Sequence, residues 1–313
     1  MTECERIIKE GLLPKSFFEE EIRNDFLVTV ERKKIWAVEL DLLSTFDRIC
    51  KKYGLRYFLF WGSLLGAVRH NGFVPWDDDT DVVMPRKDYE ELLKHGEEFQ
   101  EPYFFQTPYT DKGFFYAHAK LRNSNTTAWD RPFAYQGTNF GVFLDILPLD
   151  NVQIDGGQER FDRVNKLILD NSTAMKLSNP NPSEKDKARI AQYDGTDPYE
   201  RYEEIHQIAR LFENEETEYV STLACTTYGF NRDTFYASDF DRTEIVDFEG
   251  LKFPIPQGYR RVLEISYGDY MQLPPIEKRG GWHGNLLFDM DTPYKDFIRK
   301  CNGVFPSEFE KKI

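Results

Sequence analysis

The segment that decides the fold spans residues 58–83, with the sequence FLFWGSLLGAVRHNGFVPWDDDTDVV. Residues 56–60 are mostly apolar and predict a short buried strand, after which Gly62-Ser63 predicts a turn into a helix over 62–70. The apolar residues after the acidic run predict a second strand over 80–84. A strand, a glycine turn, a helix and a second strand therefore succeed one another, and the acidic run lies where the second strand begins.

The acidic run places two carboxylates on one face of the second strand. Side chains alternate between the faces of a strand, so Asp79 and Asp81 point the same way. Two adjacent carboxylates repel each other unless a positive charge lies between them. A divalent cation such as Mg²⁺, bound by carboxylates and by substrate phosphates, is a common solution. The alternatives are a solvated acidic turn and a calcium loop. The calcium loop is disfavoured because Val82 stands where that loop needs glycine.

Two further features flank the acidic run in the sequence. Gly62 permits close backbone approach, and a helix that starts at Ser63 directs free N–H groups outward, which suits a phosphate; an ordinary structural turn is the alternative. Asp145 is the single acid in the apolar segment 143–147, which predicts a strand. A buried carboxylate is costly without a partner. We therefore expect Asp145 to be a third metal ligand, a base or one half of a salt bridge.

The rest of the chain indicates a mixed sheet followed by a mostly helical second half. Apolar spacing predicts helices over 29–53, 158–176, 199–223 and 258–267, strands near 103–106, 115–122 and 141–147, a hairpin over 244–253 and a polar loop over 178–197. We expect an N-terminal extension (1–28), a core with the metal site (29–150) and a helical extension (151–313). The last loop of that extension, after Pro274-Pro275, is expected to return to the site.

Composition and charge exclude several classes of protein. The 313 residues include 40 Lys and Arg against 54 Asp and Glu, a formal charge of −14. This charge disfavours nucleic-acid binding and unaided adhesion to an anionic membrane. The first residues lack the pattern of a signal peptide, and no apolar run reaches the roughly 20 residues that span a bilayer. None of the four cysteines forms a C-x-x-C pair, which indicates free thiols. We therefore expect a cytoplasmic protein, with peripheral docking at the inner face of the membrane left open.

The quoted residues resemble a known fold and, more closely, one family. The Gly62-Ser63 turn, the Asp79-x-Asp81 pair and Asp145 on a later strand resemble the nucleotidyltransferase (polymerase-beta-like) superfamily. The stretch 62–81 resembles the LicD family. The same family pattern continues in three outer segments, 143–150 (FLDILPLD), 247–251 (DFEGL) and 256–275, the last of which ends in YGDYMQLPP. Thr80 stands where the family usually has Ile, and Gly280-Gly281-Trp282 is richer in glycine than the family pattern.

The resemblance implies both a fold and an activity. The fold is α+β, a mixed sheet flanked by helices with a mostly helical C-terminal extension. The activity is transfer of a phospho-alcohol, foremost phosphocholine, from a CDP-alcohol to a hydroxyl of a cell-surface glycan, such as lipopolysaccharide or teichoic acid, or of its lipid-linked precursor, with release of CMP. The eukaryotic fukutin group is similar. A true nucleotidylyltransferase that releases pyrophosphate and a catalytically silent nucleotide-binding protein are the alternatives.

The resemblance also implies roles for particular residues. Mg²⁺ or Mn²⁺ would be held by Asp79, Asp81 and Asp145. The expected phosphate contacts are Gly62, Ser63, Arg69, Lys120 and Arg122. His283 is expected to act as an acid-base group or a phosphate ligand, whereas His70 is expected to be structural. Choline would need aromatic faces, for which the candidates, with a core role as the alternative for each, are Trp61, Trp76, Trp129, Tyr135 and Trp282.

Overall fold

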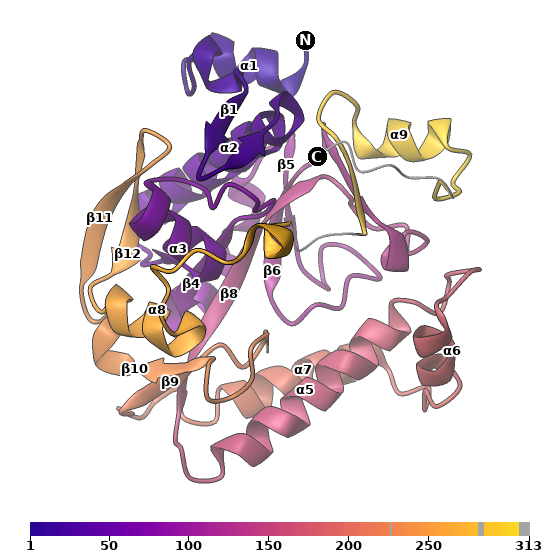
Figure 1. The fold of residues 1–313 in the computed structure, drawn as a ribbon. Coiled ribbons are helices and arrows are strands. Elements are labelled where there is room, and N and C mark those ends of the chain that lie inside the picture. The colour runs from indigo at the N-terminus through magenta and orange to yellow at the C-terminus, as the bar shows by residue number, and fades with distance from the viewer. Residues whose placement is uncertain (226, 281–284, 307–313) are drawn as a thin grey trace.

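The computed structural model describes residues 1–225, 227–280 and 285–306 (Figure 1). A seven-stranded mixed sheet lies at its centre, with the order β10-β9-β8-β4-β3 and with β6 and then β5 added beside β8. Its strands are β3 (Phe58–Leu59), β4 (Asp81–Pro85), β5 (Tyr103–Gln106), β6 (Ala119–Asn123), β8 (Val142–Val152), β9 (Tyr219–Ser221) and β10 (Thr234–Tyr236). Only β4 and β8 pair in parallel. A mixed sheet flanked by helices is the predicted architecture.

The long strand β8 organises the sheet. Its first half pairs with β6 and its last residues pair with β9, while β4 lies along its other edge. The predicted strand over 141–147 is therefore part of a longer one. The predicted strand over 115–122 is shorter in the structure, because pairing in β6 begins only at Ala119. The division of the chain near residue 150 into a core and an extension stays a prediction.

Three helices accompany the first strands. They are α2 (Val30–Tyr53), α3 (Trp61–His70) and α4 (Arg86–Leu93). Thr29 caps α2 by accepting a hydrogen bond from Arg32 N, and Gly54 ends it with φ of 68°. This left-handed geometry favours glycine. The predicted helices over 29–53 and 62–70 are confirmed, with ends that differ by a residue.

The second half needs two corrections. It contains α5 (Gly157–Ala174), α6 (Glu184–Ile190) and α7 (Pro198–Ala209), seen at the bottom and right of Figure 1. The predicted helix over 199–223 was wrong beyond Ala209, because the acidic segment 213–218 has no apolar stripe and the next residues form β9 on the edge of β8. The predicted loop over 178–197 contains α6, which Ser183 caps by accepting a hydrogen bond from Asp186 N.

Smaller elements surround the sheet. The remaining helices and strands are α1 (Glu3–Lys9), β1 (Glu21–Arg23), β2 (Phe26–Val28), β7 (Thr127–Asp130), β11 (Thr243–Phe248), β12 (Leu251–Pro256), α8 (Tyr259–Tyr267), β13 (Leu286–Asp289) and α9 (Tyr294–Lys300). The short 3₁₀ helices are η1 (Lys15–Phe18), η2 (Gly96–Glu98), η3 (Arg131–Phe133), η4 (Ala237–Phe240) and η5 (Ile276–Lys278). The predicted hairpin is β11–β12, and the predicted helix over 258–267 is α8. Strands β9, β10 and β13 were not expected, so the second half is less helical than predicted.

The main core lies between α2 and the sheet. Trp36, Phe46, Phe58, Phe60 and Phe73 are fully buried there. The rings of Trp36 and Phe73 stack with centroids 4.7 Å apart. Since Phe73 lies only four positions before Asp77, this stacking attaches the start of the acidic run to the core.

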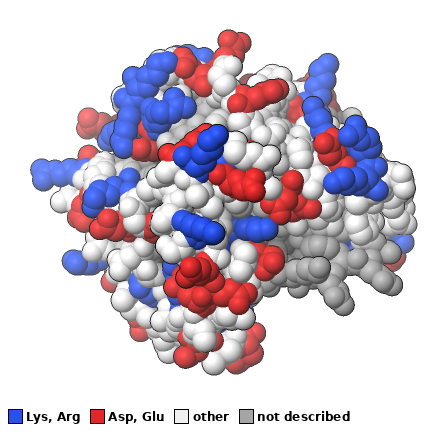
Figure 2. Space-filling view, turned by 90° about the horizontal axis from the view of Figure 1, so that it is seen from above, with Lys and Arg blue, Asp and Glu red and all other residues white. Residues whose placement is uncertain are grey.

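Surface and membrane features add two observations. No helix in the described part of the chain is long and apolar enough to cross a membrane. On the face seen from above in Figure 2, basic side chains lie among acidic ones. The acidic excess is therefore not gathered into a single patch on this face.

Candidate active site

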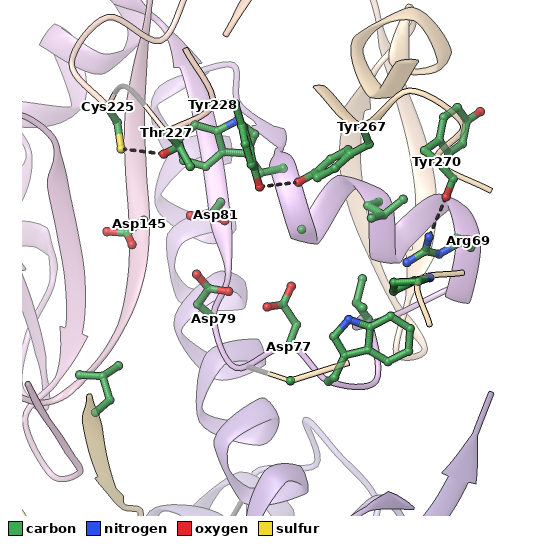
Figure 3. Close-up of a pocket in the computed structure, with 18 of the residues that line it drawn as sticks. Arg69, Asp77, Asp79, Asp81, Asp145, Cys225, Thr227, Tyr228, Tyr267 and Tyr270 are labelled. Atoms are coloured by element: carbon green, nitrogen blue, oxygen red, sulfur yellow. Dashed lines mark hydrogen bonds between the residues drawn. The ribbon is translucent and has the colours of Figure 1, made fainter. Parts of the chain in front are cut away.

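A cavity of about 740 Å³ opens where α3 and β4 begin. Five elements of the first half of the chain contribute to its lining, namely α3, β4, β6, β7 and β8. The segments around Tyr228 and over 267–280 contribute from the second half of the chain (Figure 3). In the loop after Tyr270, Pro274, Pro275 and Lys278 line the cavity.

Six aspartates line this cavity, and strand register brings two of them, Asp81 and Asp145, together. Asp81 on β4 and Asp145 on β8 are paired positions of the parallel ladder, and Asp145 N donates to Thr80 O at 3.0 Å. Figure 3 shows Asp145, Asp81, Asp79 and Asp77 following one another across the site. The cavity is lined by Asp77, Asp79 and Asp81 but not by Asp78 or Thr80, which fits the alternation of an extended chain.

The chemistry of this set fits a hard divalent cation. Carboxylate oxygens of Asp77, Asp78 and Asp79 lie within 4.8 Å of one another. Burial raises the pKa of Asp81 well above its ordinary value, and the charges of Asp79 and Asp145 raise it further. So many carboxylates at one place need a positive charge, and oxygen ligands are those that Mg²⁺ or Mn²⁺ prefers. Of the predicted pair, Asp79 thus belongs to an acidic cluster with Asp77 and Asp78. Asp81 lines the same cavity beside this cluster.

Two buried donors hold the backbone of the acidic segment. The carbonyl oxygen of Asp77 accepts hydrogen bonds from Arg32 Nη1 at 2.5 Å and from Trp36 Nε1 at 3.0 Å, both on α2. Burial lowers the pKa of Arg32, while the charges of Asp78 and Asp77 oppose this. Arg32 is therefore an internal positive charge beneath the aspartates. Outer contacts of this kind orient metal ligands.

The glycine-serine turn packs directly against the aspartates. A Cβ atom on Gly62 would lie 2.4 Å from Asp77 Oδ2, so only glycine leaves room for this carboxylate. Ser63 Oγ accepts a hydrogen bond from Asp81 N at 2.9 Å and joins the start of α3 to the start of β4. Gly62 lines the cavity, whereas the Ser63 side chain is buried and supports Asp81. The predicted phosphate contact of these two residues stays a prediction.

Asp145 has two basic partners. Its Oδ1 lies 2.7 Å from Lys120 Nζ and 3.0 Å from His118 Nε2, and both partners lie within or next to β6. Burial by itself would raise the pKa of Asp145, but Lys120 and His118 outweigh burial and hold it well below its ordinary value. Asp145 is therefore ionised. The expected salt bridge is present, and the predicted roles as metal ligand or base stay predictions.

The two predicted arginines both hold backbone carbonyls. Arg122 lines the cavity and donates from Nη1 to Gly141 O at 2.7 Å, with Nε bonded to Gln106 Oε1, and burial lowers its pKa to about 10. Arg69 also lines the cavity and donates from Nη1 to Tyr270 O at 2.7 Å (Figure 3). Arg69 thus attaches the C-terminal loop to α3.

Of the two predicted histidines, His70 makes a contact with its neighbour Arg69. Arg69 Nε donates to His70 Nε2 at 2.9 Å. Burial, with the charge of Arg69, lowers the pKa of His70 to about 4. His70 is therefore a neutral acceptor with a structural contact, as predicted. His283 lies outside the described residues.

The aromatic candidates separate into two groups. Trp61 and Trp76 line the cavity. Trp129 and Tyr135 pack instead in a second cluster with Phe305, and neither lines the cavity, so for these two the core alternative holds. Trp282 lies outside the described residues.

Several site residues were not found from the sequence. His118 lies two positions before Lys120 and shares its face, which was the only local signal for it. Tyr228 and Tyr267 line the cavity from segments far away in the chain. Tyr267 belongs to a segment quoted for the family resemblance, but no role was assigned to it.

The DFEGL motif at 247–251 has a supporting role. Glu249 N donates to Asn71 O at 2.9 Å, and the Glu249 carboxylate accepts from Phe73 N at 3.1 Å and from Arg23. The β11–β12 turn thus holds the backbone between α3 and the acidic segment. This support was not predicted.

A glycine turn against an acidic strand, with a further acid on the neighbouring parallel strand, defines a nucleotidyltransferase-type site. Residues 54–160 match the family described as LicD/FKTN/FKRP, nucleotidyltransferase domain. The predicted resemblance is confirmed, and this stretch is a LicD-type nucleotidyltransferase domain.

Individual relatives agree with the family match. The chain is 26% identical over 270 residues to the lipopolysaccharide cholinephosphotransferase LicD of Haemophilus influenzae, a match that covers 78% of this chain and 92% of the relative. An uncharacterized protein of Rickettsia prowazekii is 33% identical over 60 residues, which cover 19% of this chain and 23% of the relative. One of Rickettsia typhi is 38% identical over 47 residues, 15% of each chain. The similarity to the LicD protein thus extends over most of the chain, well beyond the residues 54–160 that match the family model.

Proposed function

We propose that the protein transfers a phospho-alcohol, foremost phosphocholine, from a CDP-alcohol to a hydroxyl of a surface glycan or of its lipid-linked precursor, and releases CMP. The observation that carries this proposal is the acidic cluster at Asp77, Asp79 and Asp81, with Asp145 beside it in one cavity. The similarity to a lipopolysaccharide cholinephosphotransferase supports the alcohol and the acceptor. We place the reaction on the cytoplasmic side of the membrane.

The acidic residues would hold the metal ion. Asp77, Asp79 and Asp81 offer oxygen ligands from one face of the chain, and Asp145 lies beside them on β8. Because Lys120 and His118 hold Asp145 in its ionised form, its ligand role is favoured over its role as a base. When bound, Mg²⁺ or Mn²⁺ would neutralise charge on the diphosphate of the donor.

Other residues would position the donor. The first N–H groups of a helix have no partner within the helix, and the α3 terminus at Gly62 lines the cavity, which suits a phosphate. Lys120 and Arg122 add positive charge on the β6 side. Arg69 keeps the loop over 270–275 against α3, which closes the cavity beside the donor.

Substitution and chelation test this proposal. With lipopolysaccharide supplied as the acceptor, Asp81→Asn should abolish release of CMP from CDP-choline while the protein still folds. EDTA should stop the wild-type reaction until Mg²⁺ is restored. Asp247→Asn is the matched control, because Asp247 lies on the exposed face of β11 and its carboxylate pairs with Lys252. An active Asp81→Asn variant would contradict the proposal. Release of pyrophosphate in place of CMP would support a nucleotidylyltransferase, and binding without turnover a silent protein.

A further inference from the structure

One wall of the cavity is built from three aromatic rings. Trp61, Tyr228 and Tyr267 come from distant parts of the chain and all line the cavity. The ring centroids of Trp61 and Tyr228 are 5.9 Å apart with the rings perpendicular, and those of Tyr228 and Tyr267 are 5.6 Å apart at 70°. The two tyrosine hydroxyls lie 3.3 Å apart. Rings at such steep angles form a concave corner, which we call the aromatic corner.

The aromatic corner is held in place by polar contacts behind it. Tyr228 N donates to Asp233 Oδ2 at 2.7 Å, and Gly229 N donates to the same oxygen at 2.9 Å. The guanidinium of Arg232 lies 4.7 Å from the centre of the Tyr228 ring and donates to Ser266 O, next to Tyr267. The backbone segments of the two tyrosines are therefore connected through Arg232 and Asp233, in addition to the contact between the two hydroxyls.

The backbone at Trp61 is unusual as well. Trp61 has φ of 41°, a left-handed conformation that is rare for a bulky residue. Such conformations cost free energy and persist where the surroundings require them, often at ligand sites. Here the conformation brings the indole to the start of α3, where Trp61 lines the cavity beside Gly62.

Acidic side chains line the same cavity as the aromatic corner. Burial raises the pKa of both tyrosines, and the charges of Asp77 and Asp81 raise it further, so these carboxylates act on the corner. Figure 3 shows Tyr228 next to Asp81, and Tyr267 beyond Tyr228 on the side away from Asp145. The aromatic corner lies next to Gly62 through Trp61, whereas Lys120 lies beside Asp145.

The corner suits one class of cation in particular. A quaternary ammonium group has no N–H and cannot donate to a carboxylate, so ring faces and a nearby negative field are what bind it. A primary ammonium group would instead bind by donating to a carboxylate such as Asp77. We propose that Trp61, Tyr228 and Tyr267 receive the quaternary ammonium of the donor and so select choline. This inference rests on the proposed function and adds the residues that choose the alcohol.

Binding of two matched ligands tests the proposal. CDP-choline is compared by calorimetry, in Mg²⁺, with the neutral analogue in which a tert-butyl group replaces the trimethylammonium. Wild-type protein should bind CDP-choline about 3- to 30-fold more tightly, the range of a cation over aromatic rings. Tyr267→Leu should bring this ratio close to one, whereas Tyr267→Phe, which keeps the ring, should preserve it. Tyr228→Leu gives a second measurement if Tyr267→Leu fails to fold.

The outcomes separate this proposal from the one on which it rests. If the wild-type protein binds the two ligands equally, or binds CDP-ethanolamine more tightly than CDP-choline, the role of the aromatic corner is overturned while the transferase proposal stands. An unchanged ratio in folded Tyr267→Leu and Tyr228→Leu variants overturns it too. If no CDP-alcohol binds at all, the proposed function itself fails.

Discussion

A single methyl group at Gly62 should separate the metal site from the stability of the fold. The Cβ of Gly62→Ala would lie 2.4 Å from Asp77 Oδ2, whereas ordinary contact begins near 3.4 Å. The carboxylate of Asp77 must therefore move by about 1 Å, which a side-chain rotation can provide. Gly62 lies in the first turn of α3, where alanine favours the helix by less than the roughly 1 kcal/mol of an interior position. The variant should thus fold as well as wild type.

The displacement of the Asp77 carboxylate should lower the affinity of the site for the metal ion. Changes next to metal ligands typically lower metal affinity about 10- to 100-fold, which is about 1.4–2.8 kcal/mol. We expect Gly62→Ala to bind Mn²⁺ more weakly by this factor in a titration followed by electron paramagnetic resonance. Thermal melts in EDTA should lie at or slightly above the wild-type temperature.

Gly66→Ala is the matched control on the same helix. Its Cβ would meet backbone atoms, Gly72 O at 2.3 Å and Val74 N at 3.0 Å, which cannot rotate away. This variant should lose about 1–3 kcal/mol of stability through overpacking. The reasoning is refuted if folded Gly62→Ala binds Mn²⁺ within 3-fold of wild type, or if it is destabilised as much as Gly66→Ala.

Arg86→Met breaks a buried ion pair in which Arg86 Nε lies 2.6 Å from Asp150 Oδ1. Urea denaturation should show that the free energy of unfolding falls by about 3–5 kcal/mol, and a fall of less than about 1 kcal/mol would contradict this. Burial raises the pKa of Asp233 to about 6, so the folded state holds this proton more tightly than the unfolded state does, and stability falls as the pH rises from about 4 to 6. Asp233→Asn should flatten this pH dependence of the melting temperature. An unchanged slope would disprove the assignment. Trp36→Phe removes one of two donors to the Asp77 carbonyl and should weaken Mn²⁺ binding about 3- to 10-fold, whereas unaltered affinity would show that Arg32 alone suffices.

Much of the site's first layer could be predicted because it is local in sequence. The alternation of Asp79 and Asp81, the turn at Gly62-Ser63 and the helix after it follow from short-range geometry. Strand β4 and helix α3 therefore lie close to their predicted bounds. The order of the motifs was also enough to predict the family.

Long-range pairing explains the errors. The segment 219–221 was assigned to a helix because the chain before it is helical, yet it forms β9 by pairing with the last residues of β8. Strand β13 forms only because β7, some 150 residues earlier, offers an edge. Local periodicity carries no information about a partner strand, and tertiary pairing overrides weak local propensity.

The sequence by itself determined that acids would share one face of a strand beside a glycine turn, because a strand repeats every two residues. Only the tertiary structure decided which partners those acids have. Lys120 reaches Asp145 through the β6–β8 register, and Tyr228 and Tyr267 reach the cavity through the packing of the second half. The physical reason is that residues far apart in the chain meet only when the whole core closes, and no local pattern specifies which of them will meet.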